Sequence, residues 1–210
     1  MEGRNLEKKT EINNLHFLVH PGFIHRFHHG LDRGSFSGEE GVALLDKYVE
    51  QAKALGGQEV MILFTPTSPW MFSQDVRKTS NPDKYALAIR EIKKNLGDRL
   101  IVIADQGDIM INDDSSDRER VWSRIKKILE KRGFILSNQL TAEAYGEYWN
   151  HCVSAIAANM HLASGMADEN PVAVRTKLTE FSLNPPPRRP EPKFKNVKLD
   201  LPEKDADKSF

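Results

Sequence analysis

The sequence has a single cysteine, Cys152, and no long apolar run. One cysteine cannot form a disulfide within the chain, which fits a reducing compartment. No apolar stretch approaches the roughly 20 residues that span a bilayer. Residues 1–14 also lack the apolar core of a signal peptide. We therefore expect a soluble, cytoplasmic protein with no membrane partner.

An excess of charge of either sign is also missing, because 30 Lys and Arg residues balance 30 Asp and Glu residues. Nucleic-acid binding usually requires a strong basic excess, so no nucleic-acid partner is expected. The sequence contains neither a G-x-G-x-x-G fingerprint nor a Walker phosphate loop. We therefore expect no cofactor.

Short apolar runs alternate with longer segments of helical periodicity. The strand candidates are residues 15–19, 59–65, 99–105 and 134–137. The helix candidates are residues 38–55, 82–96 and 120–132, and a further helix that begins at Tyr148 or Trp149. This alternation predicts an α/β fold, a three-layer sandwich with a mostly parallel, Rossmann-like sheet.

The composition divides the chain into two parts. Residues 1–183 are predicted to form a single α/β domain, in which 171–183 is an edge-strand candidate. Residues 184–210 are rich in proline and charge, which predicts an extended or disordered tail. Val197, Leu199 and Leu201 alternate along this tail, so an extended arm would present them on one face. The tail therefore leaves open a homo-oligomer in which the arm docks on a second subunit.

Ligands of open parallel sheets bind outside the carboxyl ends of the strands. Polar residues follow four apolar runs in this way, and the sequence predicts a small-molecule site among them. The loops begin at His20, at Thr65, at Asp105 and around residues 146–152. Thr65, Thr67 and Trp149 are the predicted substrate-binding residues.

Five of the seven histidines lie in residues 15–30, and they raise the question of a metal site. They are His16, His20, His25, His28 and His29. A zinc site needs three or four convergent ligands, which His25 could join only if it shared a helical turn with His28 or His29. The favoured interpretation is that His16 is a core or sheet-face residue, that the others lie at the surface, and that no metal is bound. His20 is the exception, because it ends the first strand and can act as a base.

Asp105 ends the third predicted strand, where a carboxylate can act as a general base or bind a divalent cation. The acidic residues that follow it are better explained as helix caps.

The stretch GEYWNHCV, residues 146–153, resembles the isochorismatase-like cysteine hydrolases. In that family a strand ends at a glycine, and a nucleophilic cysteine followed by valine starts a helix. The resemblance implies that Cys152 is the nucleophile, and a helix N-terminus favours the thiolate. The family's aspartate after the first strand is replaced here by His20, and its lysine has no counterpart.

The sequence thus predicts a small-molecule-binding α/β protein with an altered or incomplete triad, and it leaves open whether the protein is catalytic. One alternative is a cysteine hydrolase that uses Cys152 with His20 as base. Another is a metal-dependent hydrolase that uses His20 and Asp105. Cys152 can also have a purely structural role, as a small buried hydrophobic residue on a core helix.

Overall fold

The computed structural model describes residues 9–21, 38–66, 82–105, 115–148, 152–180 and 196–200. These residues contain a six-stranded sheet in the order β3-β2-β1-β4-β5-β6, and each neighbouring pair of strands is parallel. The strands are β1 (Thr10–Val19), β2 (Glu59–Pro66), β3 (Leu100–Asp105), β4 (Phe134–Tyr148), β5 (Val172–Glu180) and β6 (Val197–Leu199). The helices are α2 (Gly38–Ala54), α4 (Pro82–Leu96), α6 (Ser115–Lys131), α7 (Ser154–Ser164) and the 3₁₀ helix η2 (Gly97–Arg99).

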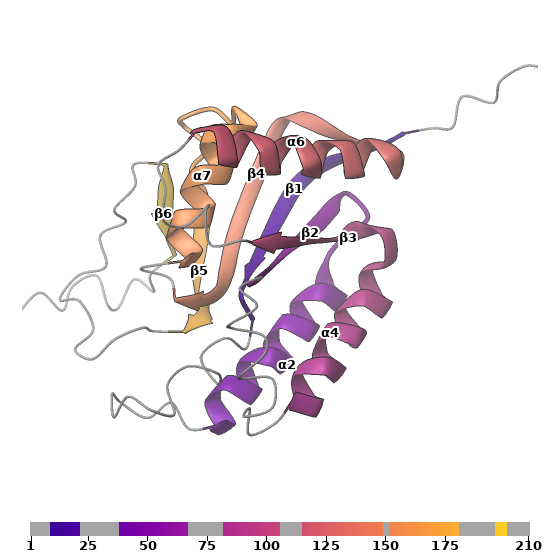
Figure 1. The fold of residues 1–210 in the computed structure, drawn as a ribbon, viewed down its shortest axis with the longest axis vertical. Helices are drawn as coiled ribbons and strands as arrows, with labels where there is room; N and C mark the ends of the chain where they lie inside the picture. Colours follow the sequence, from indigo (N-terminus) through magenta and orange to yellow (C-terminus); the bar gives the residue numbers. More distant parts are fainter. Residues whose placement is uncertain are drawn as a thin grey trace, which may run out of the picture.

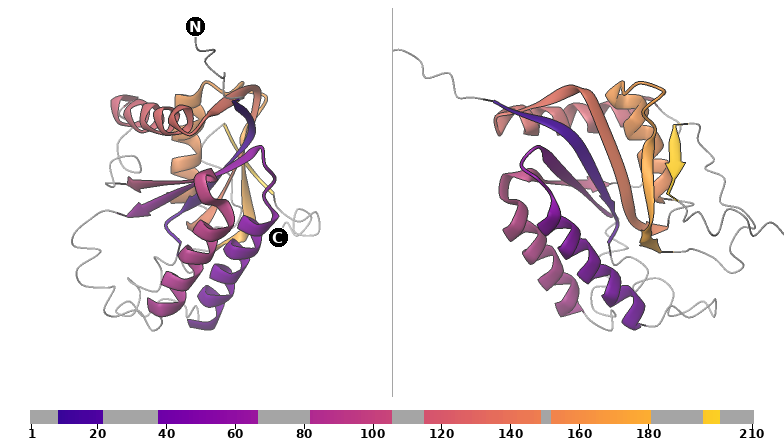
Figure 2. Two further views of the ribbon diagram at one scale, coloured as in Figure 1. Left: turned by 90° about the vertical axis from the view of Figure 1, so that its right-hand side faces the viewer. Right: turned by 180° about the vertical axis from the view of Figure 1, so that it is seen from behind.

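Helices cover both faces of this sheet, which confirms the predicted three-layer α/β fold. Helices α2 and α4 lie side by side on one face, and α6 and α7 lie on the opposite face (Figures 1 and 2). A parallel sheet covered on both faces has strands that are apolar at successive positions. Residues 60–64 of β2 show this pattern, since all five are buried.

Helical periodicity explains how α2 and α4 seal their face. In α2, Leu45, Tyr48 and Ala52 recur at helical spacing and are buried against the sheet. Helix α4 has the predicted bounds 82–96, with proline in its first turn, where no intrahelical N–H bond is lost.

None of the helices in the described ranges combines the length and the apolar character that a membrane span requires.

Strand β4 differs from the prediction. We expected a short strand at 134–137 and a helix from residue 148 or 149, but β4 runs unbroken from Phe134 to Tyr148. Its second half alternates buried Ala142 and Ala144 with more exposed polar residues, so its apolar signal is weak. An irregularity divides the strand: between the pairs Ile12–Leu136 and Asn14–Thr141, β1 advances two residues and β4 five.

Strand β5 is not the edge strand that the sequence predicted, because β6 pairs with its outer side. Val172 and Val174 of β5 pair in register with Val197 and Leu199 of β6. Val197 is buried in the chain's own core, and Leu199 packs against it. This part of the predicted tail therefore extends the sheet of its own chain, and Leu201 lies outside the described residues.

The two halves of the sheet meet at an unusually close contact between β1 and β4. Gly146 pairs with Val19 and has a φ of 136°, a conformation that residues with a Cβ rarely adopt. A Cβ at this position would overlap the Val19 carbonyl oxygen and lie 2.7 Å from the Val19 nitrogen. Only glycine fits here, because both colliding groups belong to the backbone and cannot rotate away.

We predict that Gly146→Ala lowers the free energy of unfolding by more than about 3 kcal/mol, because it forces apart two paired strands. Chemical denaturation followed by circular dichroism measures this loss. Gly57→Ala is the matched control, since a Cβ there meets nothing within 4 Å. Equal stability of the two variants would contradict the close β1–β4 contact.

Candidate functional site

The strand order reverses at the centre of the sheet. From β1 the chain builds outward to β2 and β3 on one side, and then to β4, β5 and β6 on the other. Ligands of such sheets bind at the carboxyl ends of the strands at this point of reversal. Val19 is the last residue of β1, and it pairs with Phe64 on one side and Gly146 on the other. The candidate site is therefore the carboxyl edge between β1 and β4.

The parallel registers place the predicted residues at this one edge. His20 follows β1, Thr65 lies near the end of β2, and Asp105 ends β3. Asp105 is nevertheless remote from His20, because β2 separates their strands and neighbouring strands lie about 4.8 Å apart, which gives about 10 Å between strand axes. The Thr65 hydroxyl donates a hydrogen bond of 3.4 Å to the Ile103 carbonyl, so its proton is used in a contact between β2 and β3.

His20 has a backbone conformation that the sequence did not predict. Its φ is 47°, in the left-handed region, and among the described residues it is the only non-glycine residue with a positive φ. Its side chain is buried, and its N–H donates to the Phe64 carbonyl at 3.0 Å. A left-handed histidine costs about 1 kcal/mol relative to glycine, and residues held in such conformations cluster at functional sites.

Two stacked tyrosines support the same edge from the α2 side. The rings of Tyr48 and Tyr145 are 6.0 Å apart and nearly parallel. The Tyr48 hydroxyl donates to the Gly146 carbonyl at 2.9 Å, which fixes the backbone beside Val19. The Tyr145 hydroxyl is buried and has no hydrogen-bond partner within the described ranges. Helix α2 thus contacts the site in two ways, through the hydrogen bond of Tyr48 and through the stacking of Tyr48 on Tyr145.

Cys152 lies two residues before α7 and precedes its N-cap residue Val153, and the resemblance places a nucleophile at such a helix start. Its side chain is only 3% exposed, and it belongs to the apolar core with Val153 and Ile156. This environment is typical of a structural cysteine, although the residue has the chain position that the resemblance implies. Trp149 and Thr67, both predicted to bind substrate, lie outside the described residues, as do His25, His28 and His29.

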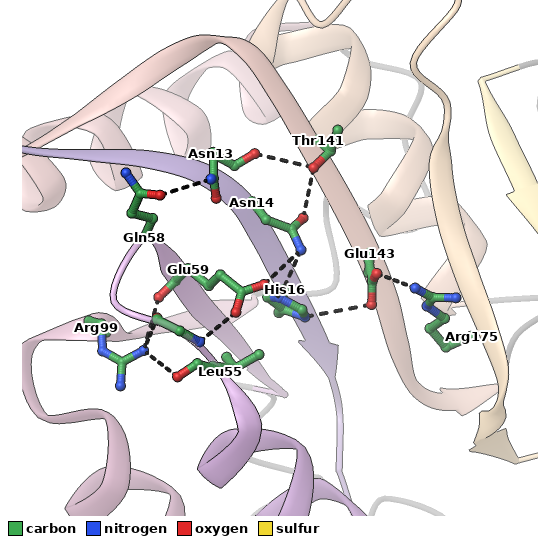
Figure 3. A network of polar contacts seen from close by, with 11 residues as sticks. Asn13, Asn14, His16, Leu55, Gln58, Glu59, Arg99, Thr141, Glu143 and Arg175 are labelled. Carbon is green, nitrogen blue, oxygen red and sulfur yellow. Dashed lines mark hydrogen bonds and ion pairs between the residues drawn. The ribbon is translucent and has the colours of Figure 1, made fainter.

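A second polar feature, which the sequence did not reveal, crosses the sheet from strand to strand (Figure 3). We call it the polar row, and each member comes from or next to a different strand. Its members are Glu59 (β2), His16 (β1), Glu143 (β4), Arg175 (β5) and Asp200, which follows β6. The polar row lies on the face covered by α2. His16 and Glu143 are two residues before Leu18 and Tyr145, which belong to the core on that face, and strand residues two apart point to the same side of the sheet.

Consecutive members of the polar row are in contact. His16 Nε2 is 3.3 Å from Glu59 Oε1, and His16 Nδ1 is 3.8 Å from Glu143 Oε2. Arg175 pairs with the other oxygen of Glu143 and, at 3.4 Å, with Asp200. His16 was predicted to be a core or sheet-face residue, and its side chain is indeed only 3% exposed.

Burial and charge act in opposite directions on this row. Burial lowers the pKa of His16 below its ordinary value, although Glu143 and Glu59 raise it. Burial raises the pKa of Glu59, but hydrogen bonds from the Gly56 N–H, Asn14 and His16 outweigh it and leave that pKa low. Burial, and then the charges of Glu143 and Glu59, raise the pKa of Tyr145. Tyr145 therefore stays a neutral phenol beside two carboxylates.

No three His, Cys, Asp or Glu side chains within the described ranges are arranged to hold a metal ion. The combination of His20 and Asp105 therefore lacks a third ligand in this part of the chain.

Comparisons with known proteins identify no family. No protein-family model matches the chain, and no curated protein matches it. The fold and the placement of the side chains therefore carry the functional proposal.

The tyrosine pair gives a matched prediction. Tyr48→Phe should lower the free energy of unfolding by about 1–2 kcal/mol, because it leaves the buried Gly146 carbonyl without its donor. Tyr145→Phe should be neutral or stabilising, because it removes a buried hydroxyl that has no hydrogen-bond partner in the described part of the chain. Urea denaturation of both variants measures the difference. A larger loss for Tyr145→Phe would contradict the assigned hydrogen bonds.

The left-handed conformation of His20 gives a second prediction. His20→Gly should be more stable than His20→Ala by about 1 kcal/mol, because only alanine keeps a Cβ at positive φ. Both variants lose the imidazole, so their difference in thermal or urea denaturation isolates the backbone. An alanine variant that is the more stable of the two would show that residue 20 is not left-handed.

Proposed function

We propose that the protein binds a small molecule at the carboxyl edge between β1 and β4 and that it has lost the chemistry of the hydrolases it resembles. The observation that carries this proposal is the position of His20. It is held buried and left-handed at the point where the strand order reverses. An imidazole there can donate or accept a hydrogen bond to a ligand.

The residues around the edge support binding without catalysis. The sequence offers His20 in place of the aspartate of the resembled family and has no matching lysine. Cys152 is buried among apolar side chains, whereas reactive cysteines are partly exposed in electropositive surroundings. Binding without turnover therefore agrees with the residues better than hydrolysis does.

The test is a screen of small acids, amides and amines against the ¹⁵N-labelled protein. We expect amide shifts to cluster at residues 20, 65, 146 and 152. His20→Gly should weaken the bound compounds about tenfold or more, which corresponds to about 1.4 kcal/mol. Gln58→Ala at the opposite edge is the control and should change nothing. Shifts that cluster near Gln58, or affinities that His20→Gly leaves unchanged, would refute the proposal.

A cysteine hydrolase is the second candidate, favoured by the place of Cys152 two residues before α7. Thiol labelling distinguishes the two, because the chain has a single cysteine. A binding protein predicts slow labelling of the native protein and fast labelling after unfolding. Native labelling faster than that of a free cysteine at neutral pH would favour the hydrolase.

A further inference from the structure

His16 is the one member of the polar row that can change its charge near neutral pH. It lies between a carboxylate of β2 and a carboxylate of β4, and it is almost completely buried. The neighbouring strands β1 and β4 are those that join the two halves of the sheet. A change of charge at His16 therefore acts at the centre of the fold.

The hydrogen bonds around Asn14 fix the neighbourhood of the imidazole. The Thr141 hydroxyl lies 3.2 Å from both Asn14 Oδ1 and the Asn13 carbonyl, and Asn14 Nδ2 donates to Glu59 at 3.2 Å. Asn14 Nδ2 is also 3.0 Å from His16 Nε2. The Asn14 amide is therefore held in one orientation, and it competes with His16 for the same oxygen of Glu59.

Neither neutral tautomer of His16 can donate to both carboxylates. If Nε2 carries the proton, it donates to Glu59, and the Nδ1 lone pair faces the Glu143 carboxylate. If Nδ1 carries the proton, it points toward Glu143, and the Nε2 lone pair accepts from Asn14 Nδ2 at 3.0 Å. Only the protonated ring donates toward both carboxylates, and among the described residues Nδ1 has no partner within hydrogen-bond distance. Burial opposes that charge.

We propose that His16 is a proton-operated switch in the sheet: the neutral ring pairs with one carboxylate, and the protonated ring pairs with both and draws Glu143 toward β1. Glu143 is shared with Arg175, so its movement changes the contact that also holds Asp200 beside β6. The separation of 3.8 Å between Nδ1 and Glu143 leaves room for this contraction, since a charge-assisted hydrogen bond is about 2.8 Å long.

The switch has a packed route to the carboxyl edge. The rings of His16 and Tyr145 are 6.1 Å apart, and Tyr145 stacks on Tyr48, whose hydroxyl holds the Gly146 carbonyl. Within the described ranges, several titratable or charged side chains face His16 or lie within one contact of it. They are Glu59 (β2), Glu143 and Tyr145 (β4), Arg175 (β5), Asp200 after β6, Tyr48 (α2) and Arg99 (η2), which binds the Gly56 carbonyl beside Glu59.

Stability gives one readout. The pKa of His16 is lowered on folding, so the unfolded chain takes up this proton first as the pH falls below 6.5. The wild-type free energy of unfolding should therefore decrease between pH 7 and pH 5, and His16→Gln should lack that component. The stability that Glu59 contributes is also lost in acid, but only at pH values below the ordinary glutamate pKa of 4.5. The pH range therefore separates the effect of His16 from that of Glu59.

Imidazole NMR titration of the folded protein gives the decisive readout, and it depends neither on a ligand nor on the folding of His16→Gln. We expect His16 to titrate below 6.5, with the amides of Tyr145 and Gly146 shifting at the same midpoint. Glu143→Gln should lower that midpoint, and Arg175→Gln should raise it, each by on the order of one pH unit. A midpoint at or above 6.5, equal midpoints in both variants, or a Gly146 amide that does not follow His16 would overturn the switch.

Discussion

The contact between Gly146 and Val19 is the constraint on which the rest of the structure depends. It joins β3-β2-β1 to β4-β5-β6, and it does so at the edge where the strand order reverses. The backbones are so close that no side chain fits between them. Tyr48 of α2 donates a hydrogen bond to the Gly146 carbonyl at this contact. His20, which has the left-handed conformation, is the residue after Val19. The candidate site is therefore a consequence of how the two halves of the sheet are joined.

The same two strands carry the polar row, so β1 and β4 are apolar on one face and partly ionic on the other. On the face under α6 and α7, Phe17 and Phe64 pack edge to face in a continuous apolar core. On the opposite face, His16 and Glu143 take positions that would otherwise extend the core beneath α2. Buried ionic groups usually cost stability unless every partner is satisfied. The partly satisfied imidazole explains why we assign the row a responsive role.

Helices and central strands were predictable because their periodicity is strong and local. The bounds of α4 agree with the prediction, since Pro82 and Gly97 delimit a regular apolar face. The second half of β4 was missed because polar residues alternate with its small apolar ones, and the partners of Glu143 come from strands that are distant in the sequence. The conformation of His20 was not predictable, because histidine has no strict backbone preference. Its position at a strand end was predictable, and its role in binding stays a prediction, as does that of Cys152.

One nuclear Overhauser measurement tests the central contact most directly. A Cβ built on Gly146 would lie 2.7 Å from the Val19 nitrogen, and one Gly146 Hα takes that direction, which predicts a strong cross-peak between this Hα and the Val19 amide proton. This cross-peak requires no substitution and reports on the folded chain itself. Gly146 Hα protons that show cross-peaks only to residues of a strand other than β1 would contradict the account.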